Sequence, residues 1–256
     1  MPSSKFFWFD LLTPDVAASR SFYGGLAGWT TEAVMDGGYH VINAGPVGVG
    51  GILSNASPDG SQPPAPPSWL GYIWVEDVDA SIARAVKLGA ALQMPARDIP
   101  GVGRFGIVRD PQGAHVALFR PTPPPGQQHD PGMSEERGRI VWTELYTSDW
   151  KAALTFYGEL LGWKKVDEMD MGEQGTYALF NFGEGDAMGG TMNIPDVPPQ
   201  WIFYISVADA DAAAEQIVKQ GGQVVFGPMD VPGGGRAAQC IDPQGAAFGI
   251  HSRKAS

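Results

Sequence analysis

The sequence predicts an α+β fold of four βαβββ modules that form two half-open cups of eight strands each. Nine positions between Trp8 and Trp29 correspond to positions between Trp142 and Trp163, always 134 residues later, eight with the same residue and Asp10 with Glu144 in its place. A second block, from Trp69 to Ala80, recurs 132 positions later. The expected order of strands and helices also repeats within each half. The chain therefore contains a tandem repeat of two copies, and each copy contains a smaller repeat.

Local signals place the elements of the first copy in order. A strand rich in aromatic residues is expected at residues 5–12, and Thr13-Pro14-Asp15 opens a helix that Gly28 closes. The pattern does not resolve the third strand of this first unit. The elements expected after it are strands at 39–43 and 47–53, a proline-rich crossover at 54–68, a strand at 69–75, a helix at 77–88 ended by Gly89, and strands at 90–94, 104–109 and 114–119.

A proline-rich run separates the two copies and predicts domains at residues 1–120 and 138–256, joined by a linker at 121–137. The net charge of −11 disfavours nucleic acid and anionic membrane surfaces. A small neutral or weakly polar ligand fits this charge better. One cysteine, Cys240, and an N-terminus without a signal peptide indicate a cytoplasmic protein without a membrane span. Four modules in one chain can close both cups, so a monomer is expected, with a homodimer left open.

Two motifs carry a resemblance to a known family. Phe-Tyr-x-x-Leu-x-Gly-Trp occurs at residues 22–29 and 156–163, and Asp-Pro-Gln-Gly-Ala occurs at 110–114 and 242–246. Together they resemble the vicinal oxygen chelate superfamily, which includes glyoxalase I, bleomycin-resistance proteins and extradiol dioxygenases. The segments 98–104 and 230–236 look like its tandem, glyoxalase-like branch, whose members are often described as hydroxylases. The resemblance implies the cup fold but leaves the reaction open.

The resemblance also implies a divalent metal held by His, Gln or Glu side chains on the cup strands. None of the positions that can be mapped offers such a ligand, in either copy, although the ligand from the family's middle strands cannot be placed. We therefore expect no cofactor of the family type. The residues at the mapped positions are Trp8, Leu70 and Ala117 in the first copy and Trp142, Ile202 and Gly249 in the second.

Each of these tryptophans is followed two residues later by an acid, Asp10 or Glu144. The period of two places each pair on one face of its strand, so that each cup would contain an indole beside a carboxyl group. Further ligand-binding candidates by the same alternation are Tyr72, Trp74 and Tyr204. An aromatic wall with one or two acids suits a flat or amphiphilic organic molecule, with a cationic one left open because an acid can serve as its charge partner. The acids have two other possible roles, in acid/base catalysis and in purely structural hydrogen bonds.

Arginines and histidines complete the set of candidates. Arg104 and Arg236 follow glycine-rich turns and could reach a ligand or pair with Asp98 and Asp230. Alternation lets His115 and His251 point into the cups, while packing or solvent placement is the alternative for both. The other two histidines are His40 and His129, the latter in the linker and expected to be inert.

The favoured function is binding of a small, aromatic or amphiphilic molecule without the family metal site. One alternative is an enzyme of the lyase, isomerase, hydroxylase or dioxygenase type. It would use atypical metal ligands such as His40, His115 or His251, or Asp10 and Glu144 as general acid and base. A further alternative is that one cup binds a ligand and the other supports protein contacts. The ligand itself and the pairing of the modules are left open.

Overall fold

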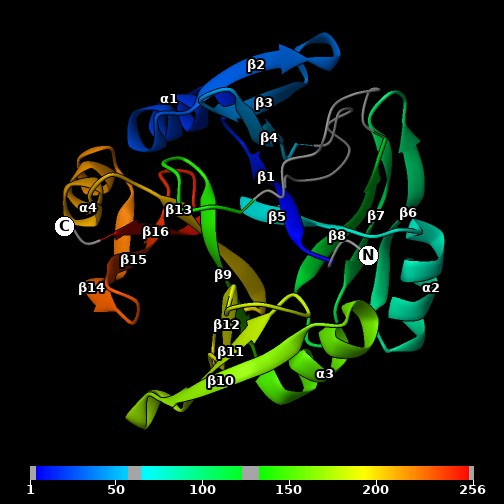
Figure 1. The fold of residues 1–256 in the computed structure, drawn as a ribbon. Coiled ribbons are helices and arrows are strands. Elements are labelled where there is room, and N and C mark those ends of the chain that lie inside the picture. The colour runs from blue at the N-terminus through cyan, green and yellow to red at the C-terminus, as the bar shows by residue number, and fades with distance from the viewer. Residues whose placement is uncertain (1–3, 57–64, 123–132, 254–256) are drawn as a thin grey trace. The chain divides into compact units, whose positions relative to one another are not determined.

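The computed structural model describes residues 4–56, 65–122 and 133–253, and within them each half follows the same order of elements (Figure 1). The first half contains β1 (Phe6–Thr13), α1 (Val16–Ala27), β2 (Thr30–Val34), β3 (Tyr39–Ala44), β4 (Val47–Ser54), β5 (Ser68–Trp74), α2 (Val78–Lys87), β6 (Ala91–Ile99), β7 (Gly103–Arg109) and β8 (His115–Pro121). The second half contains β9 (Ile140–Thr147), α3 (Trp150–Leu161), β10 (Lys164–Asp170), β11 (Thr176–Asn181), β12 (Gly189–Asn193), β13 (Gln200–Ser206), α4 (Ala210–Lys219), β14 (Gln223–Val231), β15 (Gly235–Ile241) and β16 (Ala247–Arg253).

The predicted four βαβββ modules are confirmed. The third strand that the pattern left unresolved is β2, with β10 as its counterpart. Its five residues carry no apolar alternation because β2 lies at an edge of its sheet and is mostly exposed. Residues 123–132, including His129 and most of the predicted linker, and part of the predicted crossover lie outside the described residues. The domain boundaries at 120 and 138 stay predictions.

Each α-helix begins at an aspartate that caps it, and the sequence predicts this start for the first of them, at Asp15. The Asp15 carboxylate accepts from the amide of Ala18, and the helices α1 and α3 both end at a glycine with a left-handed backbone, Gly28 and Gly162. A side chain that accepts a free amide at the first turn stabilises a helix by about 1 kcal/mol. These contacts explain why α1 and α3 share the same bounds 134 residues apart.

The strands form two sheets of eight with the same order in both halves. The orders are β2-β3-β4-β1-β5-β8-β7-β6 and β10-β11-β12-β9-β13-β16-β15-β14. Within a module the first strand pairs in parallel with the last, as β1 does with β4 and β5 with β8. The other pairs within a module are antiparallel, such as β6 with β7 and β7 with β8. This pattern is the βαβββ unit that the sequence predicts.

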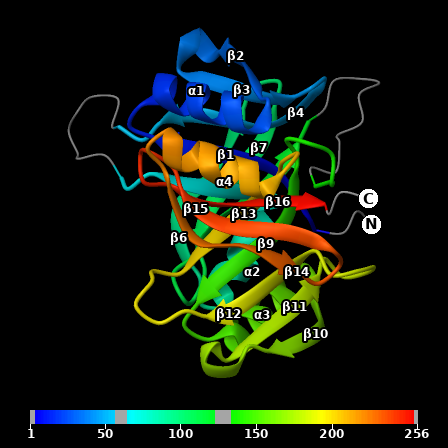
Figure 2. The ribbon, with the colours of Figure 1, turned by 90° about the vertical axis from the view of Figure 1, so that its left-hand side faces the viewer.

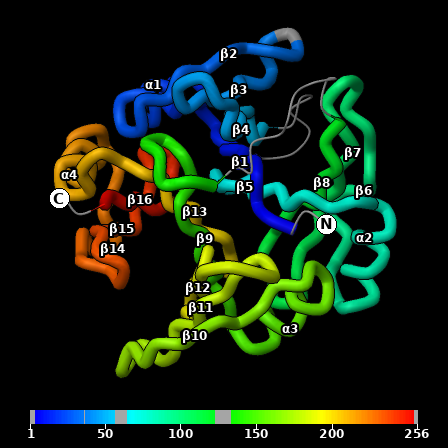
Figure 3. Tube along the Cα trace, viewed as in Figure 1, coloured from blue at the N-terminus to red at the C-terminus, as the bar shows by residue number. Residues whose placement is uncertain are grey.

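The contacts divide the chain into two compact units that do not follow the halves of the sequence. Unit 1 combines the module β5–β8 with the module β9–β12, and unit 2 combines β1–β4 with β13–β16. Figures 1 and 2 show α1 beside α4 in unit 2, and the trace in Figure 3 shows that the first and last quarters of the chain form this unit. The sequence could not predict which quarters pair, because all four modules carry similar apolar faces.

One buried hydrogen bond in each unit joins the two motifs that carry the family resemblance. In unit 2 the Tyr23 hydroxyl donates to Oδ2 of Asp242 at 3.0 Å, and in unit 1 the Tyr157 hydroxyl donates to Oδ2 of Asp110 at 3.0 Å. The other oxygen of Asp242 accepts the backbone amides of Gln244 and Ala246. Burial raises the pKa of both aspartates and both tyrosines. The motifs are therefore specific for the fold because they hold one module against another.

A second set of side-chain hydrogen bonds is complete in unit 2 but lacks one hydroxyl group in unit 1. The Thr13 and Ser19 hydroxyls lie 2.8 Å apart, and Ser19 donates to Oε1 of Gln244 at 3.2 Å. In the second copy Ser19 is replaced by Ala153. The atoms that would meet its hydroxyl, Oγ1 of Thr147 and Oε1 of Gln112, are buried without a partner among the described residues.

We expect Ala153→Ser to raise the free energy of unfolding by about 1 kcal/mol, because the new hydroxyl can bond both orphaned oxygens. Ser19→Ala is expected to lower it by about 1–3 kcal/mol, since it removes the donor to Oε1 of Gln244 and leaves Oγ1 of Thr13 with only its weak contacts to the Asp15 backbone. Urea denaturation measures both changes. Ala85→Ser, at another fully buried helix position, is the control and should destabilise the protein. A destabilised Ala153→Ser variant would contradict the argument.

Candidate functional site

The acid of the first copy lies at the centre of a cluster on β1 and β3 in unit 2. Oδ1 of Asp10 accepts the Tyr39 hydroxyl at 2.6 Å and the Trp8 indole N–H at 3.0 Å, and the same indole N–H lies 2.8 Å from the Tyr39 hydroxyl. Asp10 is only 4% exposed, whereas Trp8 and Tyr39 are half-buried. We call these three residues the acid clamp. The predicted placement of Trp8 and Asp10 on one strand face is confirmed.

A glycine on β4 makes room for the tyrosine of the acid clamp. Gly51 pairs with Asp10 in the β1–β4 register, and a Cβ added to it would lie 2.1 Å from Cζ and the hydroxyl of Tyr39. The tyrosine ring therefore lies directly on the backbone of β4, which brings its hydroxyl to the carboxylate. No larger residue than glycine fits here without moving the ring.

The second copy repeats this arrangement in unit 1. Glu144 is 3% exposed and pairs with Gly190 in the register of β9 and β12. A Cβ on Gly190 would lie 2.1 Å from Cζ and the hydroxyl of Tyr177. Sequence reasoning missed both tyrosines, because they recur 138 positions apart instead of 134. The sequence signal that could have identified these two tyrosines is the Gly-Gly pair that follows each of them and recurs in both halves.

Two further aromatic candidates, Tyr72 and Trp74, lie on a sheet face of unit 1 that points away from α2. Ile82 of α2 contacts the position of Gly106, so this face of β7 is covered by the helix. On the opposite face, Tyr72 lies 6.0 Å from both Phe105 and Phe119, and the Trp74 ring lies 5.7 Å from Phe7. Tyr72 and Trp74 are half-exposed, so their rings can contact a ligand. We call these rings on β5, β7 and β8, with Phe7, the aromatic face.

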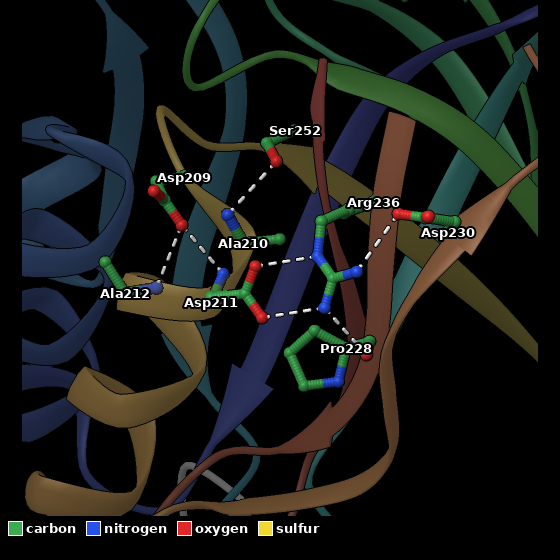
Figure 4. A network of polar contacts seen from close by, with 8 residues as sticks. All are labelled: Asp209, Ala210, Asp211, Ala212, Pro228, Asp230, Arg236 and Ser252. Carbon is green, nitrogen blue, oxygen red and sulfur yellow. Dashed lines mark hydrogen bonds and ion pairs between the residues drawn. The ribbon is translucent and has the colours of Figure 1, made fainter. Parts of the chain in front are cut away.

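The predicted arginines form ion pairs with aspartates. Arg104 binds Asp79 at 2.7 Å and Asp98 at 3.1 Å, and these bonds raise the pKa of Arg104. Arg236 binds Asp211 at 2.7 Å and Asp230 at 3.0 Å, and also donates to the carbonyl of Pro228 (Figure 4). The sequence left ligand contact and pairing with Asp98 and Asp230 open. The structure shows the pairing, which ties each hairpin to the start of a helix.

The remaining candidates lie on the module β13–β16, on β8 and on β9. Tyr204 accepts a hydrogen bond from Nε2 of Gln239 at 2.9 Å, and its ring occupies the space that a side chain at Gly249 would need. His251 is half-buried on β16, and burial lowers its pKa. His115 lies at the start of β8 opposite Arg109, and partial desolvation of the imidazole together with this arginine lowers its pKa. Trp142 is half-exposed on β9.

The lowered pKa of His251 has a direct consequence for stability. Burial favours the neutral imidazole in the folded state, so the unfolded chain binds a proton more readily as the pH falls. We expect the wild type to lose stability relative to His251→Gln between about pH 7 and about pH 5, with the largest loss below the unfolded pKa. Thermal unfolding across this range measures the difference. If the stability difference between the wild type and His251→Gln did not change with pH, the argument that burial lowers the pKa of His251 would be contradicted.

The side chains present do not fit the metal centre that the fold implies. The mapped ligand positions hold indole, aliphatic and glycine residues, and the ring of Tyr204 covers one of them, Gly249. No group of three or more His, Cys, Asp or Glu residues in the described part of the chain is arranged to hold a metal ion.

The described helices are all too short or too polar to cross a bilayer.

A small hollow of about 240 Å³ lies elsewhere in unit 1. It is lined by backbone and side chains around the Asp-Pro-Gln-Gly turn, from Gly89 to Gly113 in sequence. None of the predicted ligand-binding residues lines it. We therefore consider two separate candidate sites, the acid clamp in unit 2 and the aromatic face in unit 1.

Comparison with known proteins decides the family. The model of the "Glyoxalase/Bleomycin resistance protein/Dioxygenase superfamily" matches residues 5–118 and 139–250. The chain belongs to this superfamily. Both matched segments contain the Tyr–Asp pair motifs described above, and the tandem arrangement of the superfamily fold accounts for the two equal sheets.

Among relatives in the superfamily, "Putative glyoxylase CFP32" of Mycobacterium tuberculosis is 35% identical over 247 residues, covering 95% of this chain and 92% of that protein. "Anthracycline biosynthesis protein DnrV" of Streptomyces peucetius is 33% identical over 259 residues, covering 95% of this chain and 91% of that protein. A Mn(II)-bound glyoxalase from Novosphingobium aromaticivorans has a TM-score of 0.67 at 15% identity and covers 99% of this chain and 83% of its own. This last likeness concerns the fold alone.

Proposed function

We propose that this superfamily member binds a flat, aromatic or amphiphilic small molecule and does not use the metal site of the family. The carrying observation is the pair of buried acids, Asp10 and Glu144, each two residues after a tryptophan at a mapped ligand position. In the first copy this tryptophan donates to the acid instead of leaving room for a metal. Within unit 2, Trp8, Trp142 and Tyr204 would supply ring contacts, and within unit 1 Tyr72 and Trp74 would do so.

The name of one relative supports an aromatic ligand, because it refers to the biosynthesis of anthracyclines, which are aromatic compounds. An uncharged anthracycline aglycone is therefore a suitable probe. We expect it to bind the full chain in isothermal titration calorimetry. Tyr39→Phe and Asp10→Asn should each weaken binding by about tenfold, because the first removes a bond that orients the acid and the second removes its charge. The control is Asp98→Asn, an exposed acid paired with Arg104.

Elemental analysis of protein purified without chelator tests the metal-free part of the proposal. One equivalent of a transition metal per half, lost together with function in a His115→Ala/His251→Ala variant, would overturn it. Failure of every aromatic probe to bind would overturn the ligand class. Size-exclusion chromatography with light scattering checks the further proposal that the protein is a monomer.

A catalytic role is the second candidate, favoured by the short bond from Tyr39 to Asp10. A carboxylate held by two donors on one oxygen is oriented as a general base must be. Such an enzyme would exchange a proton next to the carbonyl of a bound aromatic ketone. Deuterium incorporation from heavy water into that position, lost in an Asp10→Asn/Glu144→Gln variant, would favour catalysis over binding alone. Binding without exchange would favour the first proposal.

A further inference from the structure

An arginine on the edge strand β6 extends the aromatic face of unit 1. Arg97 pairs with Phe105 across β6 and β7, and its guanidinium lies 5.0 Å from the centre of the Phe105 ring. The Phe105 ring in turn lies 6.0 Å from Tyr72. The cation, the phenylalanine and the half-exposed tyrosine therefore follow one another on one face of the sheet.

Two other arginines of the same sheet, Arg104 and Arg120, are paired with acids, whereas no such pair exists for Arg97 among the described residues. Arg104 pairs with Asp79 and Asp98, and Arg120 pairs closely with Glu76. Asp98, the residue next to Arg97, points to the opposite face, where it binds Arg104. Arg97 is exposed, and no carboxylate in the described part of the chain forms an ion pair with it. A guanidinium in this position can bind an external anion.

The second half lacks this combination at the matching positions. Met229 and Ala237 form the cross-strand pair that corresponds to Arg97 and Phe105. Ser206 and His251 replace Trp74 and Phe119, so that Tyr204 is the ring that remains. The two halves therefore share the same fold but carry different side chains on this face of the sheet.

We infer that the aromatic face of unit 1 selects an aromatic carboxylate, with the ring against Tyr72 and the carboxylate on the Arg97 guanidinium. A planar guanidinium accepts a carboxylate through two parallel N–H bonds, and a ring beside it gains contact with the aromatic side chains. This inference rests on the proposed function and adds the charge of the ligand. It also assigns the selectivity to the first half of the chain.

Isothermal titration calorimetry on the full chain tests the inference with three probes: 2-naphthoate, the neutral isostere 2-naphthamide, and cyclohexanecarboxylate. We expect naphthoate to bind about tenfold more tightly than either of the others. Arg97→Gln should reduce naphthoate binding to the level of naphthamide while leaving naphthamide unchanged. Arg97→Lys should fall between the two, because lysine keeps the charge but loses the paired geometry.

Two variants serve as controls. Arg84→Gln removes an exposed arginine from α2, on the covered side of the sheet, and should change nothing. The thermal unfolding midpoint of Arg97→Gln should match that of the wild type, since the side chain is exposed. Equal binding of naphthoate and naphthamide to the wild type, or equal losses in Arg97→Gln, would overturn the inference while the proposed function stands. If neither aromatic probe binds, both fail together.

Discussion

Asp242→Ala is expected to lower the free energy of unfolding by about 3–5 kcal/mol. The substitution removes the acceptor of the buried Tyr23 hydroxyl and of two backbone amides at the Asp-Pro-Gln-Gly turn. A buried donor left without a partner keeps its full desolvation cost, and three such donors lie in one place. Urea denaturation, followed by tryptophan fluorescence, measures the loss.

Two further variants set the scale of this effect. Tyr23→Phe removes the hydroxyl but leaves the turn intact, so the expected loss is smaller, about 1–2 kcal/mol. Asp230→Ala breaks an exposed ion pair with Arg236 and should cost less than about 1 kcal/mol. If Asp242→Ala unfolded at the same urea concentration as Asp230→Ala, the Tyr–Asp bond would not hold the modules together.

Gly51→Ala is expected to destroy the acid clamp. The added methyl group would lie 2.1 Å from the hydroxyl and Cζ of Tyr39, so the ring must leave its place and Asp10 loses its closest donor. We expect the affinity for the aglycone probe to fall by at least about tenfold and the protein to lose about 1–3 kcal/mol of stability from overpacking. Calorimetric titration and thermal unfolding measure the two effects separately.

Matched variants separate the clash from the loss of the hydrogen bond. In Gly51→Ala/Tyr39→Ala the ring is absent, so the double variant should lose less stability than the two single changes together, while affinity stays low. Gly38→Ala adds a methyl group at an exposed position with an ordinary backbone and should be neutral. Unchanged affinity in Gly51→Ala would show that Tyr39 does not serve the site.

The local structure followed from short-range patterns. The aspartate cap at Asp15, the closing glycine at Gly28 and the strand that carries Trp8 and Asp10 were all predicted, because each depends on neighbours within a few residues. The edge strand β2 was not resolved, since an edge strand without a buried face has no alternation to reveal it. The replaced metal ligands were also readable, because they require only residue identity at a known spacing.

The partners of the site residues were beyond the sequence. Tyr39 reaches Asp10 across 29 positions, and the glycine that admits its ring comes from a third strand. An insertion between the strands shifts the repeat, so the equivalence of Tyr39 and Tyr177 is hidden from a comparison at one offset. Arg97 drew no attention because a lone arginine in a strand gains its meaning from the ring across the ladder.

The sequence by itself determined the repeated design, the four modules, the helix ends and the absence of metal-binding side chains at the mapped positions. Only the tertiary structure decided which modules share a unit, which tyrosine orients Asp10 and which arginine stands unpaired beside the aromatic face. The physical reason is that helices, strands and their ends depend on backbone hydrogen bonds and on the spacing of apolar residues, which involve neighbours in the sequence. Pairing of modules and clustering of side chains instead depend on contacts between residues far apart in the chain, and four similar modules give several pairings nearly equal local support.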